Sequence, residues 1–96
     1  MIETRQTEVF RAWFAGLRDS RAVQAIAGRI ARVQRGALGD AQAVGEGVSE
    51  MRIHYGPGYR LYFVRRGETL VILVCGGDKS TQARDIARAK TLAKEA

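Results

Sequence analysis

The chain has 96 residues, which is enough for a single domain with one hydrophobic core. Hydrophobic residues make up 46% of the chain and charged residues 27%, a balance that excludes intrinsic disorder. Lys and Arg number 16 against 10 Asp and Glu, and the resulting net charge of +6 favours a phosphate polyanion as partner.

Residues 1–6 alternate apolar and charged side chains and predict a short strand. No apolar stretch typical of a signal peptide is present in residues 1–10. The longest apolar run, Leu70–Cys75, has six residues, too few to span a bilayer. Cys75 is the only cysteine, so no internal disulfide can form. We therefore expect a cytoplasmic protein that does not contact membranes.

Two helices are expected next. Thr7 is a suitable cap for a helix from about Glu8 to Arg18, and Ser20 for a second helix that ends near Arg35. The short connection between them makes a helical hairpin. The second helix has two faces of different character: an apolar stripe of Val23, Ile26, Ala27, Ile30 and Val33, and a basic stripe of Arg21, Arg29, Arg32 and Arg35. The basic stripe indicates either a solvated face or a binding face.

The second half of the chain reads mainly as strands. Residues 37–47 are rich in glycine and predict a loop, with room for a short strand near Val44. From Ser49 the hydrophobic period becomes two, and glycine turns at 56–58 and 66–68 divide the region into a three-stranded antiparallel meander. Its last strand, Leu70–Cys75, is continuously apolar, as expected of a strand buried on both faces. We expect Gly76-Gly77 to end this strand and a last helix to follow from about Ser80 to Lys94.

The element order β-α-α-(loop)-β-β-β-α defines the α+β class. We expect residues 1–96 to form a single domain, with a twisted, mainly antiparallel sheet of about four strands and two helices packed on one face.

The period of two separates the side chains of the meander into two faces. One face is expected to form the core beneath the helices, with Met51, Ile53, Tyr55, Leu61 and Phe63. The other face is expected to be open, with Arg52, His54, Arg60 and Tyr62. Arginine binds phosphate with a bidentate fork, tyrosine stacks on bases and histidine transfers protons near neutral pH. The open face is thus either a phosphodiester-binding surface or an ordinary polar sheet surface.

Lys79 follows two glycines and precedes a helix, which is a favourable position for an anion. The surrounding segment lacks the G-x-x-x-x-G-K-S/T spacing of a Walker A loop, so ATP binding is not expected. One histidine and one cysteine match no metal-ligand spacing, and no metal or cofactor is expected. No Ser-His-Asp or Cys-His set is apparent either.

The segment E-M-R-I-H-Y-G-P-G-Y-R-L-Y-F at 50–63 resembles the RelE/ParE superfamily of bacterial toxins, and more closely its HigB-like "addiction module killer protein" branch. The segment G-G-D-K-S-T-Q at 76–82, followed by Asp85-Ile86, is similar to the C-terminal signature of that branch. The element order matches over essentially the whole chain, and the two segments together are specific.

This resemblance implies the toxin of a type II toxin–antitoxin module: a ribosome-dependent mRNA endonuclease that works without a metal, in which the 2′-OH attacks the adjacent phosphate. It also implies a cognate antitoxin, a helix-turn-helix DNA-binding protein encoded by an adjacent gene. The toxin would contact operator DNA only through this antitoxin. Five residues are the expected catalytic residues: Arg60 first, then Arg52 and Lys79, with His54 and Tyr62 for proton transfer or stacking. Arg84 joins Arg52, Arg60 and Lys79 as an expected RNA-binding residue.

One departure from the family leaves other functions open. RelE-like ribonucleases often carry an aromatic residue or a histidine near the C-terminus, whereas here no aromatic residue follows Phe63. The general acid and base therefore remain unassigned. The alternatives are a DNA gyrase inhibitor of the ParE type, with the same fold and no nuclease activity, and a plain nucleic-acid-binding module.

Overall fold

The structure, a computed structural model, describes the whole chain, residues 1–96. Its elements, in chain order, are β1 (Glu3–Gln6), α1 (Glu8–Ala15), α2 (Ser20–Gln34), β2 (Ala41–Gly45), β3 (Val48–Ile53), β4 (Tyr59–Arg66), β5 (Leu70–Asp78), η1 (Lys79–Thr81), which is a single 3₁₀ turn, and α3 (Gln82–Glu95). No helix is long and apolar enough to cross a membrane.

The strands form one sheet in the order β1-β5-β4-β3-β2. Only β1 pairs in parallel, with β5, and the other neighbours are antiparallel. This confirms the predicted α+β class and the mainly antiparallel sheet. The sheet has five strands where about four were expected, because residues 41–45, expected to form a loop with a short strand near Val44, pair with β3 as β2.

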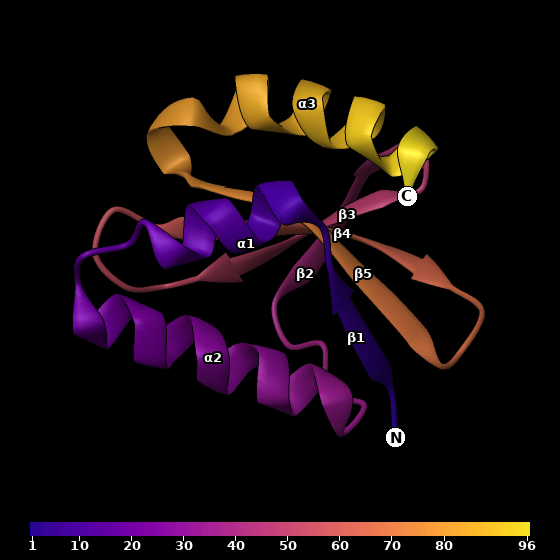
Figure 1. The fold of residues 1–96 in the computed structure, drawn as a ribbon, viewed down its shortest axis with the longest axis horizontal. Coiled ribbons are helices and arrows are strands. Elements are labelled where there is room, and N and C mark those ends of the chain that lie inside the picture. The colour runs from indigo at the N-terminus through magenta and orange to yellow at the C-terminus, as the bar shows by residue number, and fades with distance from the viewer.

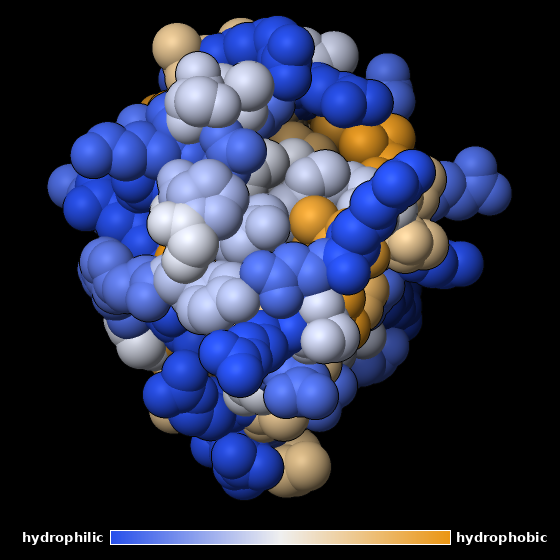
Figure 2. Space-filling view, turned by 90° about the vertical axis from the view of Figure 1, so that its left-hand side faces the viewer, coloured by the Kyte–Doolittle hydropathy of each residue, from blue (hydrophilic) through white to orange (hydrophobic).

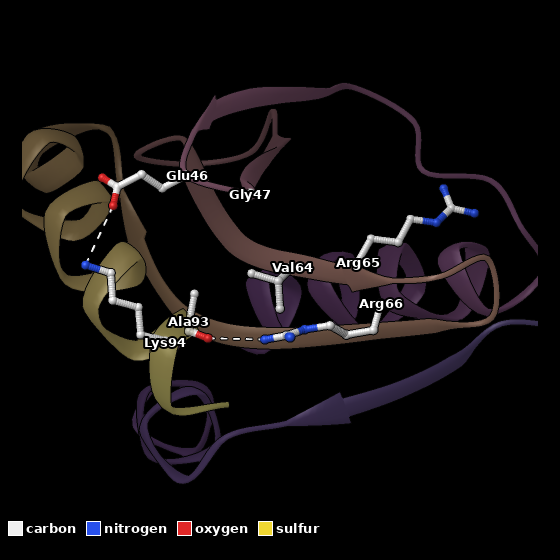
Figure 3. A pocket seen from close by; sticks show the side chains of 7 residues that line it. All are labelled: Glu46, Gly47, Val64, Arg65, Arg66, Ala93 and Lys94. Atoms are coloured by element: carbon white, nitrogen blue, oxygen red, sulfur yellow. Dashed lines mark hydrogen bonds and ion pairs between the residues drawn. The ribbon is translucent and has the colours of Figure 1, made fainter.

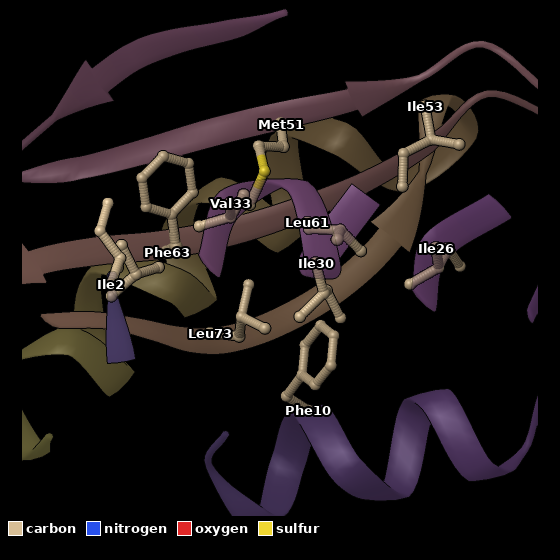
Figure 4. Packing of buried hydrophobic residues seen from close by; sticks show 11 residues of the cluster. Ile2, Phe10, Ile26, Ile30, Val33, Met51, Ile53, Leu61, Phe63 and Leu73 are labelled. Carbon is tan, nitrogen blue, oxygen red and sulfur yellow. The ribbon is translucent and has the colours of Figure 1, made fainter. Parts of the chain in front are cut away.

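The helices α1 and α2 cover one face of the sheet, as predicted (Figure 1). Their apolar residues pack on alternate residues of β3, β4 and β5 (Figure 4). The members of this core are Ile2, Phe10, Ile26, Ile30, Val33, Met51, Ile53, Leu61, Phe63, Val71 and Leu73. Four of the five predicted core residues of the meander are therefore confirmed, and Tyr55 is only partly buried at the edge of this cluster.

The helix α3 covers the opposite face, which the sequence predicted to be open (Figure 1). Ala89 and Ala93 are small enough for α3 to lie close to the sheet, and they belong to a second core with Val48, Tyr62, Val64, Val74 and Cys75. The predicted exposure of Tyr62 is therefore wrong, since its side chain has no accessible surface. The alternation sorted the residues onto the correct faces, but it carried no information on where the last helix packs.

The first two helices begin close to the predicted positions. Thr7 caps α1, because its hydroxyl accepts a hydrogen bond from the backbone N–H of Phe10 at 3.1 Å. At α2 the cap is Asp19, one residue before the predicted Ser20, and its carboxylate accepts from the N–H groups of Arg21 and Ala22. The apolar stripe of α2 is also rotated relative to the prediction, because Ala22 and Arg29 are buried while Ala27 is exposed.

The prediction that the two glycines at 76–77 end the last strand is wrong. They lie within β5, which continues to Asp78. Each glycine allows a close approach from a covering helix. A Cβ atom on Gly76 would overlap the ring of Trp13 from α1, and one on Gly77 would overlap the carboxylate of Asp85 from α3. Glycine at these positions therefore lets helices pack closely on both faces of β5.

Candidate functional site

A cleft of about 400 Å³ lies at the end of the sheet where β3 turns into β4 and β5 leads into α3. This end of the molecule is mostly hydrophilic, with paler residues of intermediate hydropathy near its middle (Figure 2). The residues that line the cleft are Arg52, His54, Tyr55, Gly56, Pro57, Gly58, Arg60 and Lys79. The structure thus brings together four of the five predicted catalytic residues, and only Tyr62 is absent from the lining.

Glu50 on β3 is the buried carboxylate around which the floor of this cleft is organised. Its side chain is 1% exposed and accepts hydrogen bonds from Gln82 Nε2 at 2.8 Å and from the Tyr62 hydroxyl at 3.2 Å. Burial, and then the negative charge of Glu50, raise the pKa of Tyr62, so this phenol stays protonated at neutral pH. Tyr62 therefore supports Glu50 from within the core and offers no surface to a substrate.

The guanidinium groups of Arg52 and Arg60 share this one carboxylate. Arg52 Nε lies 3.4 Å from Glu50 Oε2, and Arg60 Nη1 lies 3.5 Å from the same oxygen. They are adjacent because Arg52 and Arg60 are directly paired residues of β3 and β4. Glu50 falls two residues before Arg52 on the same strand and therefore on the same face.

Arg60 is incompletely satisfied by the protein. Its side chain is 11% exposed, and neither Nε nor Nη1 has a hydrogen-bond partner, since the approach of Nη1 to Glu50 has the distance of an ion pair without the geometry of a hydrogen bond. Buried donors are nearly always hydrogen-bonded in folded proteins. Both nitrogens are shielded from solvent, so Arg60 offers the cleft mainly its positive charge, which is only partly offset because Glu50 is shared with Arg52.

His54, beyond the end of β3, forms a pair with Asp40 from the loop between α2 and β2. The ring atom Nε2 lies 2.7 Å from Asp40 Oδ2. The hydrogen bond from His54 holds the pKa of Asp40 below its ordinary value. Asp40 was not among the residues predicted from the sequence, because it lies 14 positions before His54 in a glycine-rich loop.

Tyr55 was assigned to the core from the sequence, and its partly buried side chain does pack against that core, but it also lines the cleft. The strand β3 ends at Ile53, so the alternation of faces does not extend to residue 55. The Tyr55 hydroxyl donates a hydrogen bond to Asp19 Oδ2 at 2.8 Å, which raises the pKa of the tyrosine and lowers that of Asp19. An aromatic ring thus lies beside the basic groups, supplied by Tyr55 in place of Tyr62.

The segment that carries Lys79 differs from the predicted anion site. Lys79 is exposed in η1, and the preceding Asp78 occupies the turn, with its Oδ1 accepting from the N–H of Ser80 at 2.8 Å. The hydrogen bond from the Ser80 hydroxyl, and then the one from its N–H, lower the pKa of Asp78, so the carboxylate stays ionised at the position where an anion was expected. Lys79 therefore contributes its own charge to the cleft, and the backbone of the turn is already occupied by Asp78.

Arg84 lies on α3, outside the residues that line the cleft. Its side chain is exposed, with Nε 3.7 Å from Asp85 Oδ1. The predicted role of Arg84 in RNA binding would require a substrate that extends from the cleft onto α3.

A smaller hollow, of about 260 Å³, lies at the other end of β4 (Figure 3). Its basic groups already have partners: Arg66 Nη2 donates to the backbone oxygens of Ala93 and Ala96 at 3.2 Å, and Lys94 Nζ lies 3.8 Å from Glu46 Oε1. The cleft at the opposite end, where Arg60 has donors without acceptors, is therefore the stronger candidate for a ligand site.

No family model matches this sequence. Over 94 residues the chain is 47% identical to a protein of Haemophilus influenzae that is described as uncharacterized, and the alignment spans 98% of this chain and 95% of that relative. The chain belongs to the same family as this Haemophilus influenzae protein.

Proposed function

We propose that this protein is the toxin of a type II toxin–antitoxin module and an mRNA endonuclease of the RelE/ParE superfamily, in its HigB-like branch. It cuts mRNA on the ribosome without a metal ion. The observation that carries the proposal is the lining of the cleft: Arg52, Arg60 and Lys79 all line it, and no carboxylate does. Glu50 lies buried beneath the cleft and is shared by Arg52 and Arg60, so the lining keeps positive charge suited to a phosphodiester.

The chemistry that the cleft supports is attack of the 2′-OH of a nucleotide on its own 3′-phosphate. The five-coordinate transition state carries more negative charge on the phosphate oxygens than the substrate does. Arg60, Arg52 and Lys79 line the cleft, and their positive charge stabilises the charge that develops on these oxygens. The ring of Tyr55 offers a surface on which a base can stack.

The partners follow from the same proposal. The substrate is mRNA on the ribosome, and a co-expressed antitoxin with a helix-turn-helix domain holds the toxin inactive and connects it to operator DNA. Expression of this chain alone should arrest growth, and co-expression of the product of the adjacent gene should restore it.

A DNA gyrase inhibitor of the ParE type is the second candidate. One observation favours it: Tyr62 is buried beneath α3, and no aromatic residue follows Phe63, so the last third of the chain offers no aromatic side chain for base stacking. Such a toxin would leave mRNA intact and would produce double-strand breaks in DNA.

Lys79→Ala tests the proposed site with little risk to the fold, because the side chain is exposed and makes no ion pair or hydrogen bond within the protein. In a translation reaction with purified protein, this variant should cut mRNA about 10²-fold more slowly than the wild type. Lys94→Ala is the matched control, since it removes an exposed lysine from the other end of the sheet. Equal cutting by both variants would show that the cleft is not the active site.

A further inference from the structure

His54 is the only histidine of the chain and it lines the cleft. Imidazole is the side-chain group that most often acts as a general base in enzymes. Its side chain is 77% exposed and that of Asp40 is 49% exposed, so a substrate can reach the ring. Because Asp40 is an ionised carboxylate, it can only accept, and Nε2 must be the nitrogen that carries the hydrogen. The other nitrogen, Nδ1, then has a free lone pair and can accept a proton.

The loop that carries Asp40 is held by a buried arginine. Arg29 on α2 is 6% exposed. Its guanidinium donates to the backbone oxygens of Leu38 at 2.9 and 3.2 Å, of Asp40 at 2.9 Å and of Arg52 at 2.6 Å. Three carbonyl groups from the loop and from β3 thus surround one planar group with a fixed geometry of donors.

Two further contacts show how closely the loop follows this guanidinium. Gly39 has a φ of +69°, and a Cβ atom there would lie 2.8 Å from the Arg29 nitrogens. The backbone N–H of Arg52 also donates to the Asp40 oxygen at 3.0 Å. Asp40 is therefore fixed relative to β3, the strand that leads into His54.

We propose that Asp40 is a positioning residue that orients His54 as the proton acceptor of the cleft, and that Arg29 holds Asp40 in place for this task. The inference rests on the proposed endonuclease function. In the step, the 2′-OH gives its proton to Nδ1 of His54 as its oxygen bonds to phosphorus. The bond from phosphorus to O5′ breaks, and O5′ takes a proton from water. The products are a 2′,3′-cyclic phosphate and a 5′-hydroxyl, and His54 later returns its proton to solvent.

A role for Asp40 in positioning His54 can be distinguished from a role in stabilising the loop. If Asp40 acts only through His54, its removal should have no further effect once His54 is absent. If Asp40 merely stabilises the loop, its removal should lower the rate of cleavage by the same factor with and without His54. A double-mutant cycle separates the two cases. The fold is expected to tolerate Asp40→Ala, because the backbone oxygen of Asp40, and not its side chain, binds Arg29.

The experiment compares four proteins in the translation reaction: wild type, Asp40→Ala, His54→Ala and the double variant. His54→Ala should lower the rate of cleavage at saturating protein by about 10²–10⁴-fold, as expected for loss of a general base. Asp40→Ala should lower it by about 10–100-fold, by analogy with the loss of a carboxylate that orients a metal-bound histidine. The double variant should be as slow as His54→Ala. Glu68→Ala, which removes an exposed carboxylate from the turn before β5, should cut like the wild type.

Each other result is informative. If the rate of the double variant is lowered by the product of the two factors measured for the single variants, Asp40 acts independently of His54 and the inference is wrong. Undiminished cleavage by Asp40→Ala would overturn the inference while leaving the endonuclease function intact. If the wild type leaves mRNA intact, the proposed function fails and this inference fails with it.

Discussion

Arg29 and Arg32 lie on the same helix, and the sequence placed both on one basic stripe, yet the structure predicts opposite outcomes for their replacement. Arg29 is buried and satisfies three backbone carbonyls, whereas Arg32 is exposed and its side chain forms no hydrogen bond. Methionine at either position keeps the unbranched stem and removes the guanidinium. Arg29→Met should therefore destabilise the fold, and Arg32→Met should leave it nearly unchanged.

The size of the effect follows from the groups that lose their donor. An unsatisfied buried polar group costs about 1–3 kcal/mol. Arg29→Met removes the guanidinium from the oxygens of Leu38, Asp40 and Arg52, but the Asp40 oxygen keeps the hydrogen bond from the N–H of Arg52, so two oxygens lose their donor. The loop is near the surface, so water can reach part of this region, and we take the lower end of the range for each oxygen. The expected loss is about 2 kcal/mol of unfolding free energy, or a fall in Tm of about 8–16 °C for a domain of this size.

Urea denaturation followed by circular dichroism measures this loss. Arg32→Met should lie within about 0.5 kcal/mol of the wild type, as is usual for surface substitutions. If Arg29→Met loses less than about 1 kcal/mol, or no more than Arg32→Met, the loop does not depend on the guanidinium and the reasoning about Asp40 fails at its first step.

Three further predictions concern other parts of the fold. Gly77→Ala should lower the unfolding free energy by at least about 2 kcal/mol, because the added methyl overlaps Asp85. Gly28→Ala should raise it by about 0.5–1 kcal/mol, because that helical position has open space for a methyl group. The urea midpoints of the two variants should therefore move in opposite directions. The hydrogen bond from the Tyr55 hydroxyl holds the folded pKa of Asp19 below its ordinary value of 3.8. Its stabilisation is therefore complete above the unfolded pKa and is lost as the pH falls through the folded pKa, so the stability difference between wild type and Asp19→Ala should be constant near neutral pH and should shrink below about pH 4. A difference that stays constant into acid would contradict the assignment. Burial raises the pKa of Cys75 to about 11, so its thiol should react with a disulfide reagent far more slowly in the native protein than in urea, and equal rates would mean that the thiol is accessible.

The local features of the fold could be predicted because they depend on neighbouring residues. The cap at Thr7 and the alternation through Met51, Ile53, Leu61 and Phe63 depend only on side chains close in sequence or on directly paired strands. The position of α3 depends on contacts between distant segments, and no local pattern indicates that Tyr62 would be covered by Ala89 and Ala93. Gly76 and Gly77 show the same limit, since they were interpreted as strand breakers and are needed for close packing.

The candidate site could be predicted in part for the same reason. Arg52 and Arg60 are direct partners in a hairpin, so the turn between them was sufficient to place them together. Glu50 could have been found by the same alternation, because it lies two residues before Arg52 on one strand. Asp40 and Arg29 could not, because the loop between α2 and β2 is placed by tertiary contacts that no periodicity encodes.

The most direct test of the central claim is the chemical identity of mRNA ends in translation reactions to which the purified protein is added. An mRNA endonuclease of the proposed kind should give transcripts cut within the coding sequence, with 2′,3′-cyclic phosphate and 5′-hydroxyl ends. These ends should form equally well when a chelator is added at a level that translation tolerates, and cutting should be slowed strongly by Lys79→Ala. Intact transcripts, together with double-strand DNA breaks in cells that express the protein, would contradict the account and support inhibition of gyrase.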